Sequence, residues 1–194
     1  MYTLFIDTHY KDILIYLYKD YELLNKKELF GVKSTSVETM PALISLLKEK
    51  NIDVHNLNKI AVCIGPGSFT GTRIGVTIAK TLSYSLNIPI VTLTSLDLIG
   101  INLDEKSYVA VKENNGYFIG LYDKKLLSDI KYLKNAEYED FKNNNIIIEK
   151  EDIDIDRLIN FINNLKEENP HDVNPLYVKT IEALKWLVVL IWII

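Results

Sequence analysis

The residue types and spacing best suited to chemistry lie in Gly65-Pro66-Gly67-Ser68-Phe69-Thr70-Gly71, between an apolar run and a helical pattern. Gly65 and Gly67 remove side chains where the backbone approaches a neighbour, and Ser68 or Thr70 can cap the following helix. Free N–H groups at a helix start favour anions such as phosphates, although a tight turn without a ligand explains the same residues. The spacing matches neither a P-loop, which needs Gly-Lys-Ser/Thr, nor the dinucleotide-binding glycine pattern.

Asp7 and Thr8 close the first apolar run and form a second candidate site. A carboxylate beside a hydroxyl at a strand end suits water-bridged Mg²⁺ and nucleotide phosphates, and a turn cap explains the pair as well. The candidate nucleotide-binding residues are therefore Asp7, Thr8, Gly65, Gly67 and Ser68.

We expect neither a catalytic constellation nor a metal site. The three histidines are too scattered for a two-histidine helical metal motif. Cys63 lies inside a predicted buried strand, where we expect it to serve as inert packing.

Small residues recur in the helical pattern after the glycine segment. Gly71, Gly75 and Ala79 are four residues apart and share one ridge of the helix. Glycine inside a helix costs about 1 kcal/mol relative to alanine, which the close approach of another backbone would offset. That neighbour is either this chain's own sheet or a helix of a partner chain.

The elements that must position these residues follow from the hydrophobic pattern. In the first half it predicts strands over 2–6 and 13–18, paired as a hairpin, a third strand over 21–30, and further strands over 59–64 and 90–93, with helices over 37–50, 70–86 and 95–101. Pro41 fits the first of these helices only in its first turn or at a kink, because proline lacks an N–H. In the second half we expect strands near 107–112 and 117–122 around an Asn115-Gly116 turn, a strand near 126–133, a short helix, a strand at 146–148 and a helix over 153–168.

This order of elements occurs twice and predicts an α/β protein of two lobes, 1–103 and 104–180, followed by an apolar tail, 181–194. Trp186–Ile194 is a run of nine apolar residues, well short of the ~20 that a transmembrane helix needs. The tail docks on the core, covers a partner or is an altered end of the chain, and the sequence leaves these three open.

The composition excludes several classes of protein. The chain has 194 residues, of which 48% are hydrophobic, so it is not intrinsically disordered, and its single cysteine excludes a disulfide scaffold. A net charge of −4 argues against autonomous nucleic-acid binding, which needs a basic face. The N-terminus does not resemble a signal peptide, so we expect a cytoplasmic protein without membrane association.

The segment from Gly65 to Gly75, followed by Ala79-Lys80, closely resembles the signature of the bacterial TsaB (YeaZ) proteins. The resemblance continues in Ile6-Asp7-Thr8, Met40-Pro41, Ile88-Pro89 and Thr94-Ser95-Leu96, and a late Pro-x-Tyr segment at Pro175–Tyr177 is similar too. It implies a two-lobe actin-like (Hsp70-like, ASKHA, ribonuclease H-like) α/β fold with mixed sheets and flanking helices.

The resemblance also implies a role. TsaB proteins are non-catalytic scaffold subunits that pair with a catalytic paralogue, TsaD, and an ATPase, TsaE, which together modify the adenosine next to the tRNA anticodon to threonylcarbamoyladenosine (t6A). It implies contact with tRNA only through the complex, no required cofactor, and ATP or ADP as a candidate ligand at the partner interface. Because an exposed apolar helix pair tends to find a substitute contact, we expect a homodimer when the chain is alone. The implied interface residues are Met40, Leu43, Leu47, Gly71, Arg73, Ile74, Gly75, Ile78 and Ala79.

Two segments depart from the family pattern: Thr35-Ser36 replaces a His-Ser pair, and Lys112-Glu113-Asn114 replaces Asp-Ala-Arg. The rival hypothesis is an autonomous ATPase or small-molecule kinase of the same fold, which Asp7-Thr8 and the glycine segment motivate. A peptidase has only Ser68 to recommend it, because no histidine is placed by the sequence to activate that hydroxyl.

Overall fold

The first sheet begins with three consecutive antiparallel strands, β1 (Tyr2–Asp7), β2 (Ile13–Lys19) and β3 (Glu22–Leu29). β4 (Leu57–Cys63) and β5 (Ile90–Leu93) join in parallel on the other side of β1, which gives the order β3-β2-β1-β4-β5. The computed structural model describes residues 1–149 and 153–178.

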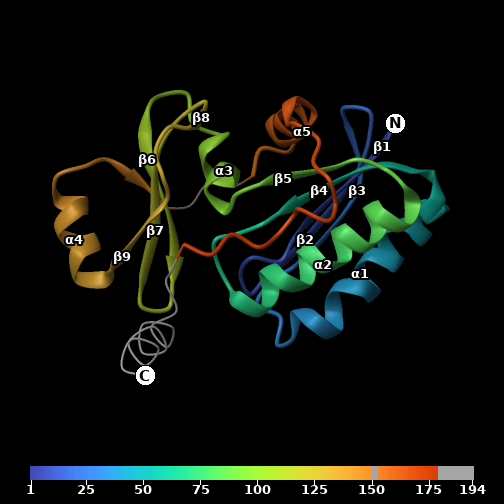
Figure 1. Ribbon diagram of the computed structural model, residues 1–194, viewed down its shortest axis with the longest axis horizontal. Coiled ribbons are helices and arrows are strands. Elements are labelled where there is room, and N and C mark those ends of the chain that lie inside the picture. The colour runs from blue at the N-terminus through green and yellow to red at the C-terminus, as the bar shows by residue number, and fades with distance from the viewer. Residues whose placement is uncertain (150–152, 179–194) are drawn as a thin grey trace, which may run out of the picture.

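Helices cover both faces of this sheet (Figure 1). α1 (Thr35–Glu49) and α2 (Phe69–Leu86) pack on one face, and α5 (Ile155–Asn164) packs on the other. Because side chains alternate along a strand, Leu4 and Ile6 of β1 point toward α1 and α2, whereas Phe5 points toward α5. A short 3₁₀ helix, η1 (Val54–Asn56), leads into β4.

The second sheet is smaller and is built around a hairpin of β6 (Ser107–Glu113) and β7 (Gly116–Asp123). β10 (Ile147–Ile148) pairs with β6, while β8 (Lys125–Leu126) and β9 (Lys131–Lys134) both pair with β7. α3 (Ser95–Gly100) packs on one face of this sheet and α4 (Asn135–Asn143) on the other. The two sheets therefore form two lobes that lie side by side with α3 between them (Figure 1).

After the second sheet the chain returns to the first. α5 packs on β1, β2 and β4, and Glu168 then forms a bridge with Ile90 of β5. Val173 is buried in the core beneath α1 and α2. The segment 165–178 thus runs along the first lobe toward the space between the lobes (Figure 1).

The structure confirms most of the predicted elements and corrects four boundaries. α1 begins at Thr35, so Pro41 lies in the second turn of a continuous helix. The hairpin turn is Asn114–Asn115, and Gly116 already belongs to β7. The strand expected over 126–133 is two short strands, β8 and β9. Pairing with β7 ends at Leu126 and resumes at Lys131. The last helix ends at Asn164, since Leu165 is extended and the following residues pair with β5.

The apolar tail lies outside the described residues. Over 1–149 and 153–178, none of the helices combines the length and apolar character needed to cross a bilayer.

Candidate functional site

The glycine turn, residues 65–71, connects β4 to α2 and lies against the loop after β1. Gly65 has a φ of +87°, a conformation that residues with a Cβ rarely adopt. A Cβ on Gly67 would overlap the carbonyl oxygen of His9, and that oxygen accepts a hydrogen bond from the Ser68 N–H at 2.6 Å. Ser68 Oγ accepts a hydrogen bond from the Gly71 N–H at 3.2 Å, so of the two predicted helix caps, Ser68 and Thr70, the one present is Ser68. The predicted close approach at this turn is confirmed.

Thr8 explains the ridge of small residues on α2. Its hydroxyl donates to the Gly71 carbonyl at 2.7 Å and accepts from the Gly75 N–H at 3.1 Å, and all these groups are buried. A Cβ on Gly71 would overlap the Thr8 carbonyl oxygen, and one on Gly75 would lie 2.5 Å from Thr8 Oγ1. The close neighbour of Gly71 and Gly75 is therefore this chain's own loop at the end of β1, and no partner helix is needed to explain the two glycines.

This packing corrects part of the interface set implied by the resemblance. Gly71, Gly75 and Ala79 are buried beneath α2, and Leu43 and Leu47 are buried beneath α1. The helical period directs all five toward the first sheet, so in this fold they support the helices from below instead of touching a partner.

Asp7, the last residue of β1, lies on the same face as Phe5, which α5 covers, whereas Thr8, the first residue after β1, turns its hydroxyl toward α2. The Asp7 side chain is almost fully buried and accepts from the backbone N–H of His9 at 2.9 Å, and Asp7 Oδ1 lies 2.7 Å from His9 Nδ1. Asp7 and Thr8 therefore do not form one site, which corrects the paired candidate.

Burial and charge set the protonation of the groups around Asp7. Burial lowers the pKa of His9, but the charge and hydrogen bond of Asp7 outweigh it, so the pKa is raised overall. Burial raises the pKa of the Cys63 thiol well above its usual value, and the nearby Asp7 carboxylate adds to the effect. Cys63 is thus a buried, protonated thiol, as its position in the strand led us to expect.

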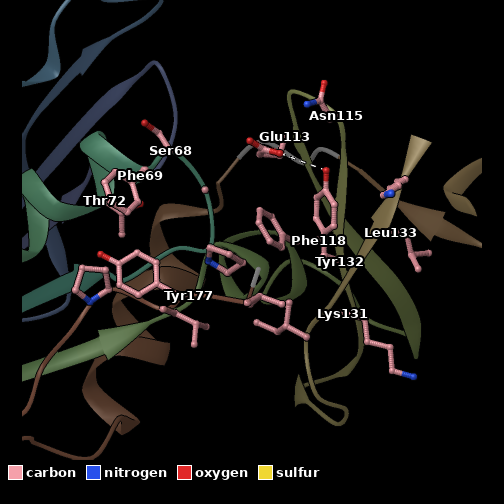
Figure 2. Close-up of a pocket in the computed structure, with 17 residues that line it drawn as sticks. Ser68, Phe69, Thr72, Glu113, Asn115, Phe118, Lys131, Tyr132, Leu133 and Tyr177 are labelled. Carbon is pink, nitrogen blue, oxygen red and sulfur yellow. Dashed lines mark hydrogen bonds between the residues drawn. The ribbon is translucent and has the colours of Figure 1, made fainter. Parts of the chain in front are cut away.

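A cavity of about 940 Å³ opens between the glycine turn and the second sheet (Figure 2). Gly67 and Ser68 form part of one wall together with Phe69 and Tyr177, whose ring centroids are 5.8 Å apart. Phe118 and Tyr132, with ring centroids 5.2 Å apart, come from the other lobe. Aromatic faces next to a helix start suit a ligand that has both planar and anionic parts.

A second cavity, of about 740 Å³, is lined by Asp7 and His9 and by residues from β2, β3, α3 and β6. Lys112, one of the positions that departs from the family pattern, also lines it. Gly67 and Ser68 line the first cavity, whereas Asp7 lines the second, so the candidate nucleotide-binding residues do not converge on one cavity.

Arg73 holds the returning chain against α2. Its guanidinium lies 3.5 Å from the centroid of the Phe69 ring, and its Nε–H donates to the Tyr177 hydroxyl at 2.6 Å. Lys80, two turns further along α2, donates to the carbonyls of His171 and Val173 at 3.2 and 2.6 Å. This role of Arg73 was not predicted from the sequence, although the late Pro-x-Tyr segment was the available signal.

α1 carries a second apolar stripe that faces away from the core. Val37, Met40 and Ile44 are spaced by three and four residues and are 65%, 40% and 56% exposed. Ile74 and Ile78 of the neighbouring α2 are half-buried. Of these five residues, Val37 and Ile44 were not predicted to lie on the interacting surface, because a helix pattern alone does not tell which of two apolar stripes is buried.

The order β3-β2-β1-β4-β5, with three antiparallel strands followed by two parallel ones and a second α/β lobe, defines a two-lobe protein of the actin-like class. YeaZ from Pseudomonas aeruginosa has this fold: the two structures superpose with a TM-score of 0.74 at 16% sequence identity, over 91% of this chain and 100% of that one. The family model of TsaD, the tRNA N6-adenosine threonylcarbamoyltransferase, matches residues 31–109.

Two relatives extend the comparison to sequence. The tRNA threonylcarbamoyladenosine biosynthesis protein TsaB of Bacillus subtilis is 42% identical over 97 residues, which are 50% of this chain and 42% of that protein. An uncharacterized protein of Mycoplasma pneumoniae is 30% identical over 92% of this chain and 95% of its own length. The chain belongs to the TsaB (YeaZ) family. It matches less than half the length of the first two TsaB relatives, at 42% and 44%.

Proposed function

We propose that the chain is a non-catalytic subunit of the enzyme system that makes t6A in tRNA, and that it binds and activates a TsaD-like catalytic paralogue. The observation that carries the proposal is the exposed apolar stripe Val37, Met40 and Ile44 on α1. Relatives named as t6A biosynthesis proteins support the pathway. The TsaD family model covers both α1 and α2, so a catalytic paralogue would present similar helices.

Like helix faces on two related chains can pair around a pseudo-two-fold axis, each stripe covering the other. The same geometry allows two copies of this chain to pair when the paralogue is absent. Burying three large apolar side chains contributes about 1.5–3 kcal/mol each, from which the cost of association must be subtracted.

A supporting role agrees with how the candidate reactive groups are used. The Thr8 hydroxyl is buried against α2, the Ser68 hydroxyl caps α2, and Asp7 is engaged with His9. A net charge of −4 disfavours a direct tRNA surface, so the partner supplies most of the tRNA contact in this proposal. A TsaE-like ATPase would be the third component, and the complex would work in the cytoplasm.

The test is size-exclusion chromatography with light scattering of this chain mixed with its cognate TsaD-like protein. Wild type is compared with Ile44→Asp, which places a carboxylate in the proposed contact, and with the matched control Ile146→Asp, an exposed isoleucine of the second lobe. We expect a mixed complex with wild type and control, and at least about a hundredfold weaker association for Ile44→Asp, because a lost apolar contact and a buried unpaired charge each weaken binding. Equal association of all three chains would contradict the proposal. Gly75 is unsuitable for this test because a side chain there would strike Thr8.

An autonomous ATPase or small-molecule kinase is the second candidate, and the aromatic cavity beside the glycine turn favours it. ATP turnover by the homogeneous chain, lost in Tyr177→Ala, which removes an aromatic face of that cavity, would support this function. A rate that does not differ between wild type and Tyr177→Ala would count against it.

A further inference from the structure

Three side chains with metal-binding atoms meet at the ends of β1 and β4. Asp7, His9 and Cys63 bring a carboxylate oxygen, an imidazole nitrogen and a thiol sulfur within 4.8 Å of one another. β1 and β4 are parallel neighbours in which Ile6 pairs with Val62, so the next residues, Asp7 and Cys63, come side by side on the face that α5 covers. The strand register therefore creates the cluster from residues more than fifty positions apart in the sequence.

We propose that Asp7, His9 and Cys63 bind a divalent transition-metal ion, for which Zn²⁺ is the best match. One oxygen, one nitrogen and one sulfur donor form the mixed set that zinc accepts, whereas Mg²⁺ and Ca²⁺ require oxygen donors. Binding displaces the thiol proton of Cys63 to solvent and leaves the thiolate as the ligand.

The distances are close to those that a tetrahedral ion requires. Zinc bonds of about 2.0–2.3 Å place neighbouring donors about 3.3–3.7 Å apart. All three donor atoms lie within 4.8 Å of one another, so the widest donor–donor distance needs to shorten by about 1 Å. The distance from His9 Nδ1 to Asp7 Oδ1 is 2.7 Å and needs to lengthen by less than about 1 Å. Rotation of the Asp7 and His9 side chains supplies both changes without moving a strand.

The backbone holds the cluster in place. The His9 carbonyl accepts from the Ser68 N–H at 2.6 Å, and the His9 N–H donates to Asp7 at 2.9 Å. Asp7 and Cys63 belong to the buried ends of two central strands. The glycine turn, with Gly67 against His9, is thus part of the support for the metal site.

An open coordination position would face the second cavity. Asp7 and His9 line that cavity, whereas Cys63 is fully buried behind them. The ion would therefore enter from the cavity and keep one position for water or a small ligand, as in zinc sites with three protein ligands.

The experiment is a titration of the metal-free full chain with Co²⁺, monitored by the thiolate-to-cobalt charge-transfer absorption, and with Zn²⁺ by calorimetry. The variants are His9→Gln and Cys63→Ser, and the matched control is His55→Gln, an exposed histidine next to β4. We expect one ion per chain with a thiolate band in wild type and control, and an affinity at least about tenfold lower in each ligand variant. No saturable binding, or equal binding by wild type and Cys63→Ser, would overturn the proposal.

X-ray absorption spectroscopy of the zinc-loaded wild type identifies the atoms that surround the ion. This measurement needs no variant, so it tests the proposal even if a substitution of a buried residue prevents folding. We expect one sulfur and two or three nitrogen or oxygen neighbours around zinc. A shell without sulfur would overturn the proposal without reference to any variant. The proposal does not rest on the TsaD-like partner, so either can fail without the other.

Discussion

Replacing Gly75 with alanine should reveal that α2 is locked to the first sheet through Thr8. In a free helix this change would add about 1 kcal/mol of stability. Here the new methyl group would lie 2.5 Å from Thr8 Oγ1 and displace a hydroxyl that makes two buried hydrogen bonds. Each such bond contributes about 0.5–1.5 kcal/mol, and the gain in helix propensity offsets about 1 kcal/mol of their loss, so we expect Gly75→Ala to lower the free energy of unfolding by up to about 2 kcal/mol.

A double-mutant cycle separates this contact from a general defect in the helix. Thr8→Ala removes the hydroxyl and should cost about 1–3 kcal/mol by itself. In that background the nearest remaining Thr8 atom, Cβ, lies 3.7 Å from the new methyl group, so Gly75→Ala should stabilise by up to about 1 kcal/mol. The double variant should then be about 1–3 kcal/mol more stable than the sum of the single effects.

The assay is urea unfolding followed by circular dichroism, with Ser85→Ala, an exposed position of α2, as the control in both backgrounds. We expect the control to be additive. Additivity of Gly75→Ala and Thr8→Ala within about 0.5 kcal/mol would refute the proposed packing of the glycine ridge.

Three further predictions concern single side chains. Ser68→Ala should lower the free energy of unfolding by about 1 kcal/mol because it removes the side-chain cap of α2. Ser34→Ala should leave it almost unchanged, because the Ser34 side chain makes no cap hydrogen bond to α1; urea unfolding compares the two variants. Arg73→Lys should cost about 0.5–1 kcal/mol and speed hydrogen exchange of the Leu176 amide, because the stacked guanidinium holds the returning segment; unchanged exchange would contradict this. Burial raises the pKa of Asp97 above 3.8 in spite of hydrogen bonds that lower it, so the folded chain takes up a proton before the unfolded chain does. The stability of wild type relative to Asp97→Asn should therefore rise as pH falls through the raised pKa toward 3.8, and a pH-independent difference would contradict the raised pKa.

The first lobe was predictable because its strands and helices have strong, regular patterns. The glycine turn also carried a local signal: Gly65 needs a positive φ and Gly67 needs an approaching backbone, and the structure contains both. The second lobe was harder, since β8 and β10 have only two residues each and depend on their neighbours for pairing.

The site was less predictable because its groups meet through tertiary contacts. Asp7 and Thr8 are adjacent in sequence, but Asp7 contacts His9 whereas Thr8, just after β1, turns toward α2, which separates a pair that looked like one site. His9 was set aside because the histidines are scattered in sequence, and Cys63 because it lies in a predicted buried strand, but the register of β1 with β4 brings the two residues together. The hydrophobic pattern of a sequence predicts whether an element is a helix or a strand, whereas the elements that pack against it determine which of its faces is buried.

The same reasoning applies to α1. Its two apolar stripes, one with Leu43 and Leu47 and one with Met40 and Ile44, share a single helical period. Only the position of the first sheet shows that the former stripe is core and the latter is surface. The exposed stripe shares Met40 with the implied interface and adds Val37 and Ile44, and this surface is the basis of the proposed partner contact.

The most direct test of the proposed function is the t6A content of tRNA, measured by mass spectrometry in a strain that lacks the gene for this chain. The strain is complemented with wild type, with Ile44→Asp, or with Ile146→Asp as the surface control, at matched protein levels. We predict that wild type and Ile146→Asp restore t6A and that Ile44→Asp leaves it strongly reduced. Full restoration by Ile44→Asp would contradict the role of the α1 face, and t6A that persists in the deletion strain itself would contradict the proposed function.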